Sequence, residues 1–341
     1  MDDSKNYIQD IRSILLKNIK PSYETTNHKE IHVRCPYCGD SKHDKSKARF
    51  YIEMRPPFRF HCFKCETSGV LNQQVLRDLG VYNNDLTIDL AEANKFVKGN
   101  GVQKISTKSL KNLIHENPYS EIAKRSLNYF NSRFHSNFDP LYVQKKFRCV
   151  LDAPAFFELN HIYAKGFDFN NAIGFISSDK SHIIFRDTSG IQQRRYCNVC
   201  LVDEDQLDIC SKMYNISGGI DVMQENVDLI ITEGIFDIIG VYNYLHHDEN
   251  DNHTIFAACC GKGYNAVIQH YLRLGFLDMN IMIFSDSDVD IQFFKDLKNN
   301  SVYLKNSRIT VVKNALYDPE TKMNKDFGVP TDSIKLNKII I

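Results

Sequence analysis

The sequence predicts an α/β protein with a small zinc-bound β-ribbon near its N-terminus and a parallel α/β domain in its C-terminal half. Three observations predict this arrangement. Two C-x2-C pairs lie in the first 65 residues, strand-like and helix-like segments alternate after residue 226, and two of these strands end in acidic residues. With 341 residues, 43% of them hydrophobic, the chain suits two or three domains with substantial cores.

The two cysteine pairs predict a metal site. A C-x2-C pair places two thiolates on one tight turn, so two pairs complete a closed tetrahedral zinc site. The intervening residues 39–61 are long enough for two short strands, as in a zinc ribbon. Four reduced cysteines at chance spacing would fit poorly with a frame punctuated by Pro36 and Gly39. We therefore predict one structural Zn²⁺, with the ligands Cys35, Cys38, Cys62 and Cys65.

The chain divides into four segments by pattern and composition. An amphipathic helix is predicted over residues 4–20, and a short helix ends at Gly80. After a polar stretch, Ile122, Leu127 and Phe130 form the apolar stripe of a further helix. The segments are a zinc-binding domain (1–81), a linker (82–120), the N-terminal basic part of a second globular region (121–225), and a parallel α/β domain with a C-terminal tail (226–341).

The last segment alternates strands and helices regularly. Such alternation is typical of a parallel sheet with helices on both faces. The carboxyl ends of its strands share one edge, where ligands bind. The predicted strands are 227–232, 253–260, 280–285 and 308–313, and the predicted helices are 235–245, 266–274 and 291–299.

Acidic residues follow two of these strands. Glu233 comes directly after the first strand, with Asp237 one turn into the next helix; Asp286 and Asp288 end the third strand, and Asp290 follows. In an extended segment Asp286 and Asp288 point the same way, so their oxygens can share one hard cation. Any one of these acids taken alone would most often be a helix cap. Because they gather at one edge of an alternating scaffold, we predict a Mg²⁺ or Mn²⁺ site.

The N-terminal motif resembles a known family. Residues 34–42, 45–49 and 60–65 are similar to the zinc-binding domain of DnaG-type primases, above all the short stand-alone primases of tailed phages. Bacterial members usually have a histidine among the four ligands, whereas this chain offers four cysteines. We therefore interpret His43 and His61 as neighbours of the zinc site and not as ligands.

The strand-end acids resemble the Toprim domain, which DnaG-type primases share with topoisomerases and some nucleases. Residues 232–237 match its Glu-Gly strand end with a trailing Asp, and residues 284–288 match its Asp-x-Asp. A glycine that usually follows the second motif is absent, so Asp288 with Asp290 is an alternative register. The pair Lys325-Asp326 resembles the Lys-Asp that follows the last Toprim strand in primases.

A basic strand pair resembles the part of the primase core that holds phosphates. Residues 182–190 form a strand running into a turn, and residues 191–196 follow. The resemblance implies that Arg186 and either Arg194 or Arg195 hold template and nucleotide phosphates, and the spacing does not distinguish the last two. Glycines around Lys262 would let a phosphate approach the backbone, although a plain turn explains that short motif equally well.

A zinc ribbon followed by a basic region and then Toprim is the primase order. The resemblance implies a DNA primase that makes short RNA primers for replication, with single-stranded DNA, ribonucleoside triphosphates and a separate replicative helicase as partners. A Toprim nuclease or recombination protein, and a non-catalytic zinc-dependent DNA-binding adaptor, are the alternatives. The implied metal ligands are Glu233, Asp286 and Asp288, with Asp237, Asp290 and Asp326 as secondary candidates. The implied phosphate ligands are Arg186, Arg194, Arg195, Lys262 and Lys325. The implied template readers are Arg49, Tyr51, Arg59 and His61.

Charge and hydropathy add little about partners but predict the compartment. Lys plus Arg equals Asp plus Glu, at 42 each, so the net charge indicates no class of partner. The start lacks the apolar core of a signal peptide, and no apolar run approaches the ~18–20 residues that span a bilayer. We expect a cytoplasmic protein (in the host cytoplasm if a bacteriophage encodes it), in which Cys197 and Cys200 are ordinary strand thiols.

Overall fold

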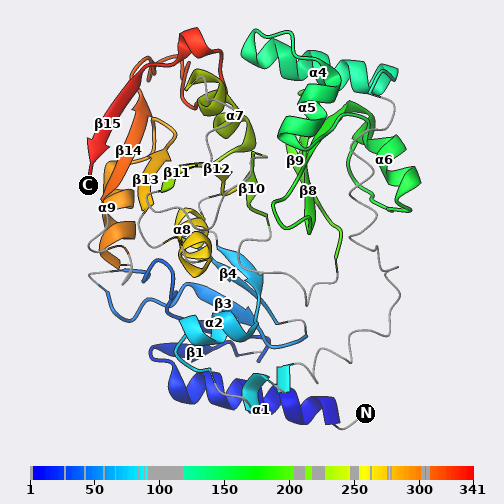
Figure 1. The fold of residues 1–341 in the computed structure, drawn as a ribbon. Helices are drawn as coiled ribbons and strands as arrows, with labels where there is room; N and C mark the ends of the chain where they lie inside the picture. The colour runs from blue at the N-terminus through cyan, green and yellow to red at the C-terminus, as the bar shows by residue number, and fades with distance from the viewer. Residues whose placement is uncertain are drawn as a thin grey trace.

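The computed structural model has a mixed α/β architecture in which three sheets are described (Figure 1). The N-terminal module lies at one end of the molecule, and the six-stranded and four-stranded sheets lie above it in this view. The described residues are 3–26, 28–41, 44–56, 58–65, 67–82, 85–87, 89–90, 118–202, 212–216, 227–245, 253–261, 263–274, 276, 279–300, 304 and 308–341. Most of the predicted linker and Lys262 are therefore outside the described residues.

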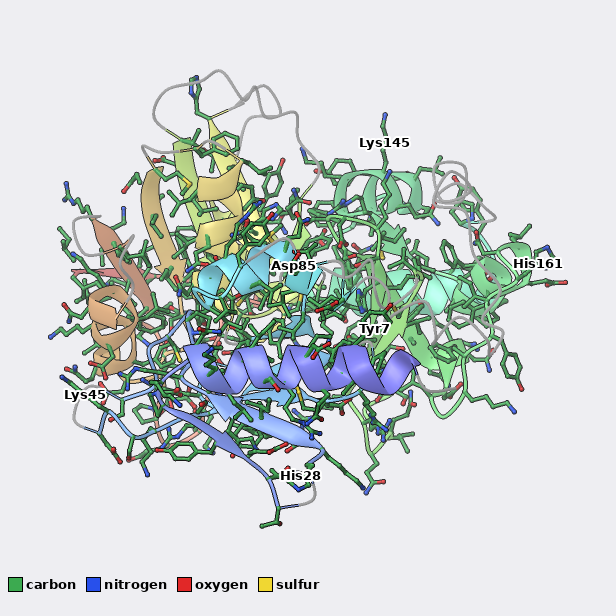
Figure 2. All side chains as sticks on the ribbon, turned by 90° about the horizontal axis from the view of Figure 1, so that it is seen from below. Tyr7, His28, Lys45, Asp85, Lys145 and His161 are labelled. Atoms are coloured by element: carbon green, nitrogen blue, oxygen red, sulfur yellow. The ribbon has the colours of Figure 1, made fainter. Side chains whose placement is uncertain are left out.

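The N-terminal module is a five-stranded antiparallel sheet with one long helix. Two short strands were predicted between the cysteine pairs, and the sheet extends further because flanking segments pair on both sides. Its order is β1 (Ser22–Glu24), β2 (Glu30–Val33), β3 (Phe50–Glu53), β4 (Arg59–Cys62) and β5 (Ser68–Val70). The helix α1 (Asp3–Asn18) contributes the buried Ile11 and Leu15 to the same hydrophobic cluster as Ile31 and Val33 of β2. It lies on the outer side of the module, away from the six-stranded sheet (Figures 1 and 2).

A short helix closes this module as predicted. The helix α2 (Gln73–Asp78) begins at Asn72, whose side chain accepts hydrogen bonds from the backbone N–H groups of Gln74 and Val75. Gly80 follows with φ +73°, a left-handed conformation that glycine adopts without steric cost.

The middle of the chain forms an antiparallel sheet with helices beside it. The buried residues of its first helix are Ala123, Ser126, Phe130 and Phe134, whereas the predicted Ile122 and Leu127 are only partly buried. The sequence pattern did not distinguish the predicted stripe from the neighbouring buried positions, because apolar residues of this helix occur on both. The elements are α4 (Glu121–Phe134), α5 (Pro140–Phe147), β6 (Cys149–Val150), α6 (Ala153–Leu159), η3 (Phe169–Asn171), β7 (Ala172–Ile176), β8 (His182–Asp187) and β9 (Tyr196–Cys200).

The C-terminal sheet has six strands, of which four are parallel. The parallel strands and the helices between them match the predicted order, but the antiparallel edge strands β10 and β15 were not predicted. Along the sheet the order is β10 (Tyr214–Asn215), β12 (Thr254–Ala258), β11 (Val227–Thr232), β13 (Met279–Phe284), β14 (Ile309–Asn314) and β15 (Leu336–Ile340). The helices are α7 (Ile235–Tyr244), α8 (Tyr264–Arg273) and α9 (Ile291–Asn300), and η5 (Thr331–Ser333) precedes β15.

The sheet is buried on both faces, as the strand–helix alternation predicts. On β11, Leu229 and Ile231 belong to the cluster that contains α8 and α9, whereas Ile230 belongs to the cluster that contains α4, α5 and α7. Alternate residues of a strand point to opposite faces, so these helices cover the two sides separately. The N-terminal module shares the α8 and α9 cluster, and the side-chain amide of Asn265 on α8 donates to the carbonyl oxygen of Tyr37.

Candidate functional site

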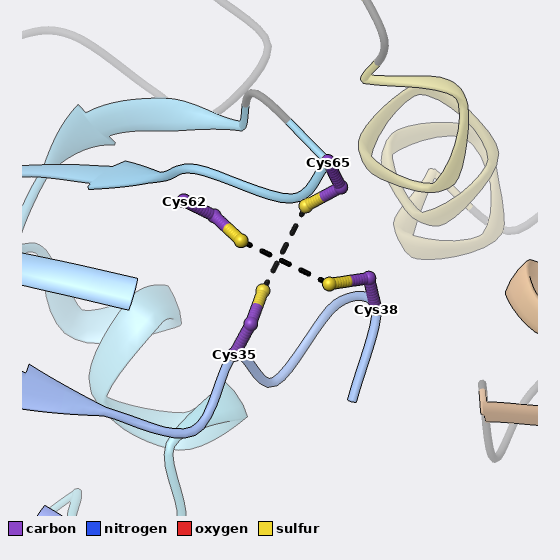
Figure 3. A group of neighbouring side chains, drawn as sticks. All are labelled: Cys35, Cys38, Cys62 and Cys65. Carbon is purple, nitrogen blue, oxygen red and sulfur yellow. Dashed lines mark hydrogen bonds between the residues drawn. The ribbon is translucent and has the colours of Figure 1, made fainter. Parts of the chain in front are cut away.

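Four buried cysteine side chains converge in the N-terminal module (Figure 3). Their sulfur atoms all lie within 4.8 Å of one another, and the Cys35–Cys65 and Cys38–Cys62 Sγ–Sγ distances are both 3.8 Å. A tetrahedral zinc ion with Zn–S bonds of about 2.3 Å places its sulfurs about 3.8 Å apart. The cluster therefore fits one Zn²⁺, as the sequence predicted.

Backbone turns and one buried carboxylate hold this cluster. Gly39 and Asp40 both have left-handed backbones, with φ +61° and +53°, which turns the chain after the first pair. The buried Asp40 accepts hydrogen bonds through Oδ2 from the backbone N–H groups of Cys35 at 2.8 Å and Arg49 at 3.2 Å. Burial raises the pKa of the Cys35 thiol. Sequence reasoning gave Asp40 no role, although an acid directly after a Cys-x-x-Cys-Gly turn is a usable signal.

The other face of the ribbon carries a row of aromatic side chains. Register pairs His32 with Tyr51 and Tyr51 with His61, so these three lie side by side across β2, β3 and β4. The rings of His32 and Tyr51 stack with centroids 3.6 Å apart, and Phe63 packs edge-on against Tyr51 and His61 while staying 62% exposed. Phe60, which faces the core, is buried.

The aromatic row includes two predicted template readers and two residues that the sequence reasoning missed. Tyr51 and His61 were predicted, whereas His32 and Phe63 were not. Strand alternation puts Arg49 on the face of Tyr51 and Arg59 on the face of His61. Tyr51, Arg59 and His61 therefore lie on one face of the sheet, and Arg49 directly precedes β3 with the same alternation.

The acidic residues lie at neighbouring strand ends of the six-stranded sheet. In the parallel pairing of β11 and β13, Thr232 is opposite Phe284, so Glu233 and Asp286 leave the sheet at the same edge. Asp237, at the start of α7, accepts a hydrogen bond through Oδ2 from the Gly234 N–H at 3.0 Å. Parallel topology therefore brings together segments about 50 residues apart, as the sequence predicted.

Lys325 joins the two aspartates of the predicted Asp-x-Asp. Its Nζ lies 3.3 Å from Asp286 Oδ2 and 3.0 Å from Asp288 Oδ2, and its carbonyl oxygen accepts from the Ser287 N–H at 2.8 Å. The hydrogen bonds with Asp288 and Asp286 raise the pKa of Lys325. Burial raises the pKa of Asp286, and Lys325 opposes that shift. An ammonium held between two carboxylates marks a place where their negative charge attracts a cation.

A second lysine fixes the shape of the loop that carries these aspartates. Lys313, the penultimate residue of β14, donates from Nζ to the carbonyl oxygens of Asp286 at 2.6 Å and Val289 at 2.7 Å, and to Ser285 Oγ at 3.1 Å. All three ammonium protons have acceptors, although burial lowers the pKa of Lys313. The sequence gave no role to this residue, which is one lysine at the end of an apolar strand.

Asp237 and Asp326 meet an arginine from α4. Burial raises the pKa of Asp237 to about 8, helped by the charges of Asp326 and Asp286 and opposed by Arg133. Arg133 Nη2 lies 3.7 Å from Asp326 Oδ1, and its guanidinium lies 5.3 Å from the ring centroid of Phe236. The middle segment of the chain therefore contributes a cation to the acidic edge of the sheet.

A cavity of about 420 Å³ opens beside this edge, between α4 and the segment 322–330. Its side chains include three cations and one carboxylate. It is lined by Tyr129, Ser132, Arg133, Lys322, Asn324, Lys325, Asp326, Gly328, Val329 and Pro330. Sequence reasoning singled out only Lys325 and Asp326 of these residues, because the contribution of α4 depends on tertiary packing.

The remaining predicted residues have different surroundings. Arg186 on β8 donates to the hydroxyl of Tyr196 and lies 4.8 Å from the centroid of that ring. Arg194 and Arg195 are exposed before β9, and Lys262 is outside the described residues. Asp290 accepts from the Gln292 N–H at 2.9 Å, so it caps the start of α9.

The carboxylates are more dispersed than the cysteines. Within the described ranges, the four cysteines are the one group of three or more candidate ligands whose ligand atoms all lie within 4.8 Å of one another. The strand-end acids share one edge of the sheet and are bridged by Lys325, but their ligand atoms do not lie as close together as the four sulfurs.

Comparisons with known proteins give no family. No protein-family model matches the chain, and no curated protein gives a significant sequence match. Among the described residues, no helix is long and apolar enough to cross a membrane.

Proposed function

We propose that this protein is a DNA primase, which makes short RNA primers on a single-stranded DNA template. The observation that carries the proposal is the meeting of Glu233, Asp286 and Asp288 at one edge of a parallel sheet, with Lys325 bridging the two aspartates. The parallel order β12-β11-β13-β14, with this acidic edge, supports a Toprim domain. The four-cysteine ribbon seated on α8 of the same domain supports the primase order over that of a nuclease.

The donor set at the sheet edge suits a hard divalent cation. Carboxylate oxygens are the ligands that Mg²⁺ and Mn²⁺ prefer, and the ammonium of Lys325 already takes up the negative charge of Asp286 and Asp288. Glu233, Asp286 and Asp288 would hold the metal, with Asp237 and Asp326 beside them. Bound there, divalent ions would activate the primer 3′-hydroxyl and neutralise the nucleotide phosphates.

The same contacts support one register of the second motif. Lys325 pairs with Asp286 and Asp288, whereas Asp290 is committed to the start of α9. These contacts support Asp286 with Asp288 as the metal-binding pair, and they leave Asp290 as a helix cap.

The cations around the cavity suit the phosphates of a nucleoside triphosphate. Arg133, Lys322 and Lys325 line it directly beside the acidic edge. A triphosphate placed there would give the ammonium of Lys325 new anionic partners when the aspartates take a metal ion. Fixed cations of this kind stabilise charge that develops on phosphate oxygens during nucleotidyl transfer.

The aromatic row on the ribbon suits single-stranded bases. Exposed rings stack on unpaired bases, and cations beside them contact the sugar–phosphate backbone. The ribbon offers Tyr51, His61 and Phe63 for stacking, with Arg49 and Arg59 on the same face. We assign template reading to this face.

Primer synthesis on a mixed-sequence single-stranded template tests the proposal. Labelled ribonucleotides and Mg²⁺ should yield short RNA products with the wild-type protein and none with Asp286→Asn. Asp290→Asn is the matched control, because asparagine caps a helix as well as aspartate does. It should retain synthesis.

The outcomes separate the proposal from its rivals. End-labelled template in the same reactions should stay intact; its cleavage without RNA products would replace the primase by a nuclease. If Asp290→Asn is inactive while Asp286→Asn is active, the metal-binding register moves by two residues.

A further inference from the structure

Tyr264 has a buried hydroxyl with no role in the acidic site described above. This tyrosine is the first residue of α8 and is 1% exposed. Its ring packs edge-on against Phe293 and Phe294 of α9, with centroids 6.2 and 5.4 Å away, and its hydroxyl oxygen has no hydrogen-bond partner among the described residues. A buried hydroxyl without a partner is destabilising, so its retention needs a reason.

The backbone around Tyr264 connects it to both acidic segments. In the loop before α8, the N–H groups of Cys259 and Gly261 donate to the carbonyl oxygens of Thr232 at 3.0 Å and Glu233 at 3.3 Å. On the other side, the α9 rings that contact Tyr264 directly follow the loop that holds Asp286 and Asp288. The segments on both sides of Tyr264 therefore adjoin the two strand ends that carry the acids.

The charges that affect the pKa of Tyr264 also connect it with both acidic segments. Burial is the main cause that raises the pKa of Tyr264, and the charges of Cys259, Glu233, Asp286 and Asp237 raise it further, in that order. The hydroxyl therefore stays protonated as a donor, and the carboxylates whose charges act on it come from both acidic segments.

We propose that Tyr264 is a positioning residue of the divalent-metal site, whose hydroxyl donates a hydrogen bond to a carboxylate once that carboxylate holds the ion. This inference rests on the function proposed above. Carboxylates that bind metals are themselves held by hydrogen bonds from surrounding groups, which fix their orientation. Tyr264 is a buried, uncommitted donor near the segments that carry such carboxylates, and it would orient them without touching the substrate.

The test is Mn²⁺ binding to full-length protein, measured by electron paramagnetic resonance without nucleotide or DNA. Tyr264→Phe keeps the ring packing and removes only the hydroxyl. We expect Mn²⁺ to bind about ten-fold more weakly, the low end of the effect of losing such a hydrogen bond. Thermal stability should stay equal or rise, since a buried hydroxyl without a partner is removed. Tyr271→Phe is the control, because it removes the hydroxyl of another buried tyrosine of α8, which packs against Phe276, and it should leave the Mn²⁺ affinity unchanged.

Each result decides between a positioning role and simple packing. Unchanged Mn²⁺ affinity in a folded Tyr264→Phe protein overturns the inference and leaves the proposed function standing. Absence of any Mn²⁺ binding by the wild type overturns both. If Tyr264→Phe does not fold, 3-fluorotyrosine at position 264 replaces it: its fluorine resonance should shift on addition of Mg²⁺, and an unmoved resonance overturns the inference.

Discussion

Replacing Lys325 by methionine should change metal binding and primer synthesis in opposite directions. Methionine keeps most of the apolar stem and removes the ammonium that holds Asp286 at 3.3 Å and Asp288 at 3.0 Å. Lys325 is 37% exposed, so each ion pair is screened and stabilises by about 0.5–1 kcal/mol. A divalent ion no longer has to displace these two pairs, and the gain of about 1–2 kcal/mol corresponds to roughly 5–30-fold tighter binding.

Synthesis should fall in the same variant, because Lys325 is then missing from the phosphate-binding cavity. We expect a loss of about ten-fold or more, measured as primer yield at saturating Mg²⁺. Lys322→Met is the matched control, since Lys322 lines the same cavity and is exposed. It should weaken nucleotide binding and leave Mn²⁺ affinity unchanged. Weaker Mn²⁺ binding by Lys325→Met would refute the idea that the ammonium and the ion compete for the same carboxylates.

Three further substitutions test the remaining assignments. Glu233→Gln keeps the size of the side chain and removes its charge, so the circular dichroism spectrum should survive while primer yield falls by roughly two orders of magnitude or more; wild-type yield would remove Glu233 from the site. Cys62→Ser should lose zinc in elemental analysis and unfold the ribbon, whereas Cys197→Ser should keep it, and a loss there would reveal a second site. Asp40→Ala leaves the buried Cys35 N–H and the partly buried Arg49 N–H without their acceptor, which should lower the free energy of unfolding by about 1–3 kcal/mol. An equal loss in Asp44→Ala, which removes a half-exposed carboxylate, would contradict this.

Local patterns predicted the zinc cluster and the parallel strands well. The spacing of Cys35, Cys38, Cys62 and Cys65 is set by the geometry of one ion, and a buried strand such as β11 leaves a continuous apolar run. The edge strand β10 was not predicted because it leaves no such run. β10 has two residues, and a two-residue strand has no period to detect.

The residues that complete the site were hidden because their roles depend on distant packing. Arg133 is an ordinary arginine in the last turn of α4, and only tertiary structure places it beside Asp326. Lys313 ends an apolar strand, and its role appears only when its three acceptors from the Asp286 loop are in place. Tyr264 reads as a core aromatic, and its uncommitted hydroxyl is visible only in three dimensions.

The hydrogen bond between Asn265 and Tyr37 links zinc binding in the N-terminal module to the stability of the six-stranded sheet. The knuckle that carries Cys35 and Cys38 rests on the start of α8, and both belong to one hydrophobic cluster. Unfolding of the turn that carries Cys35 and Cys38 would expose the start of α8, the helix beside the acidic edge. By mass action, each ten-fold rise of free zinc above its dissociation constant adds about 1.4 kcal/mol to the stability of this joint unit. We therefore expect the melting temperature of the six-stranded sheet to rise with the concentration of free zinc.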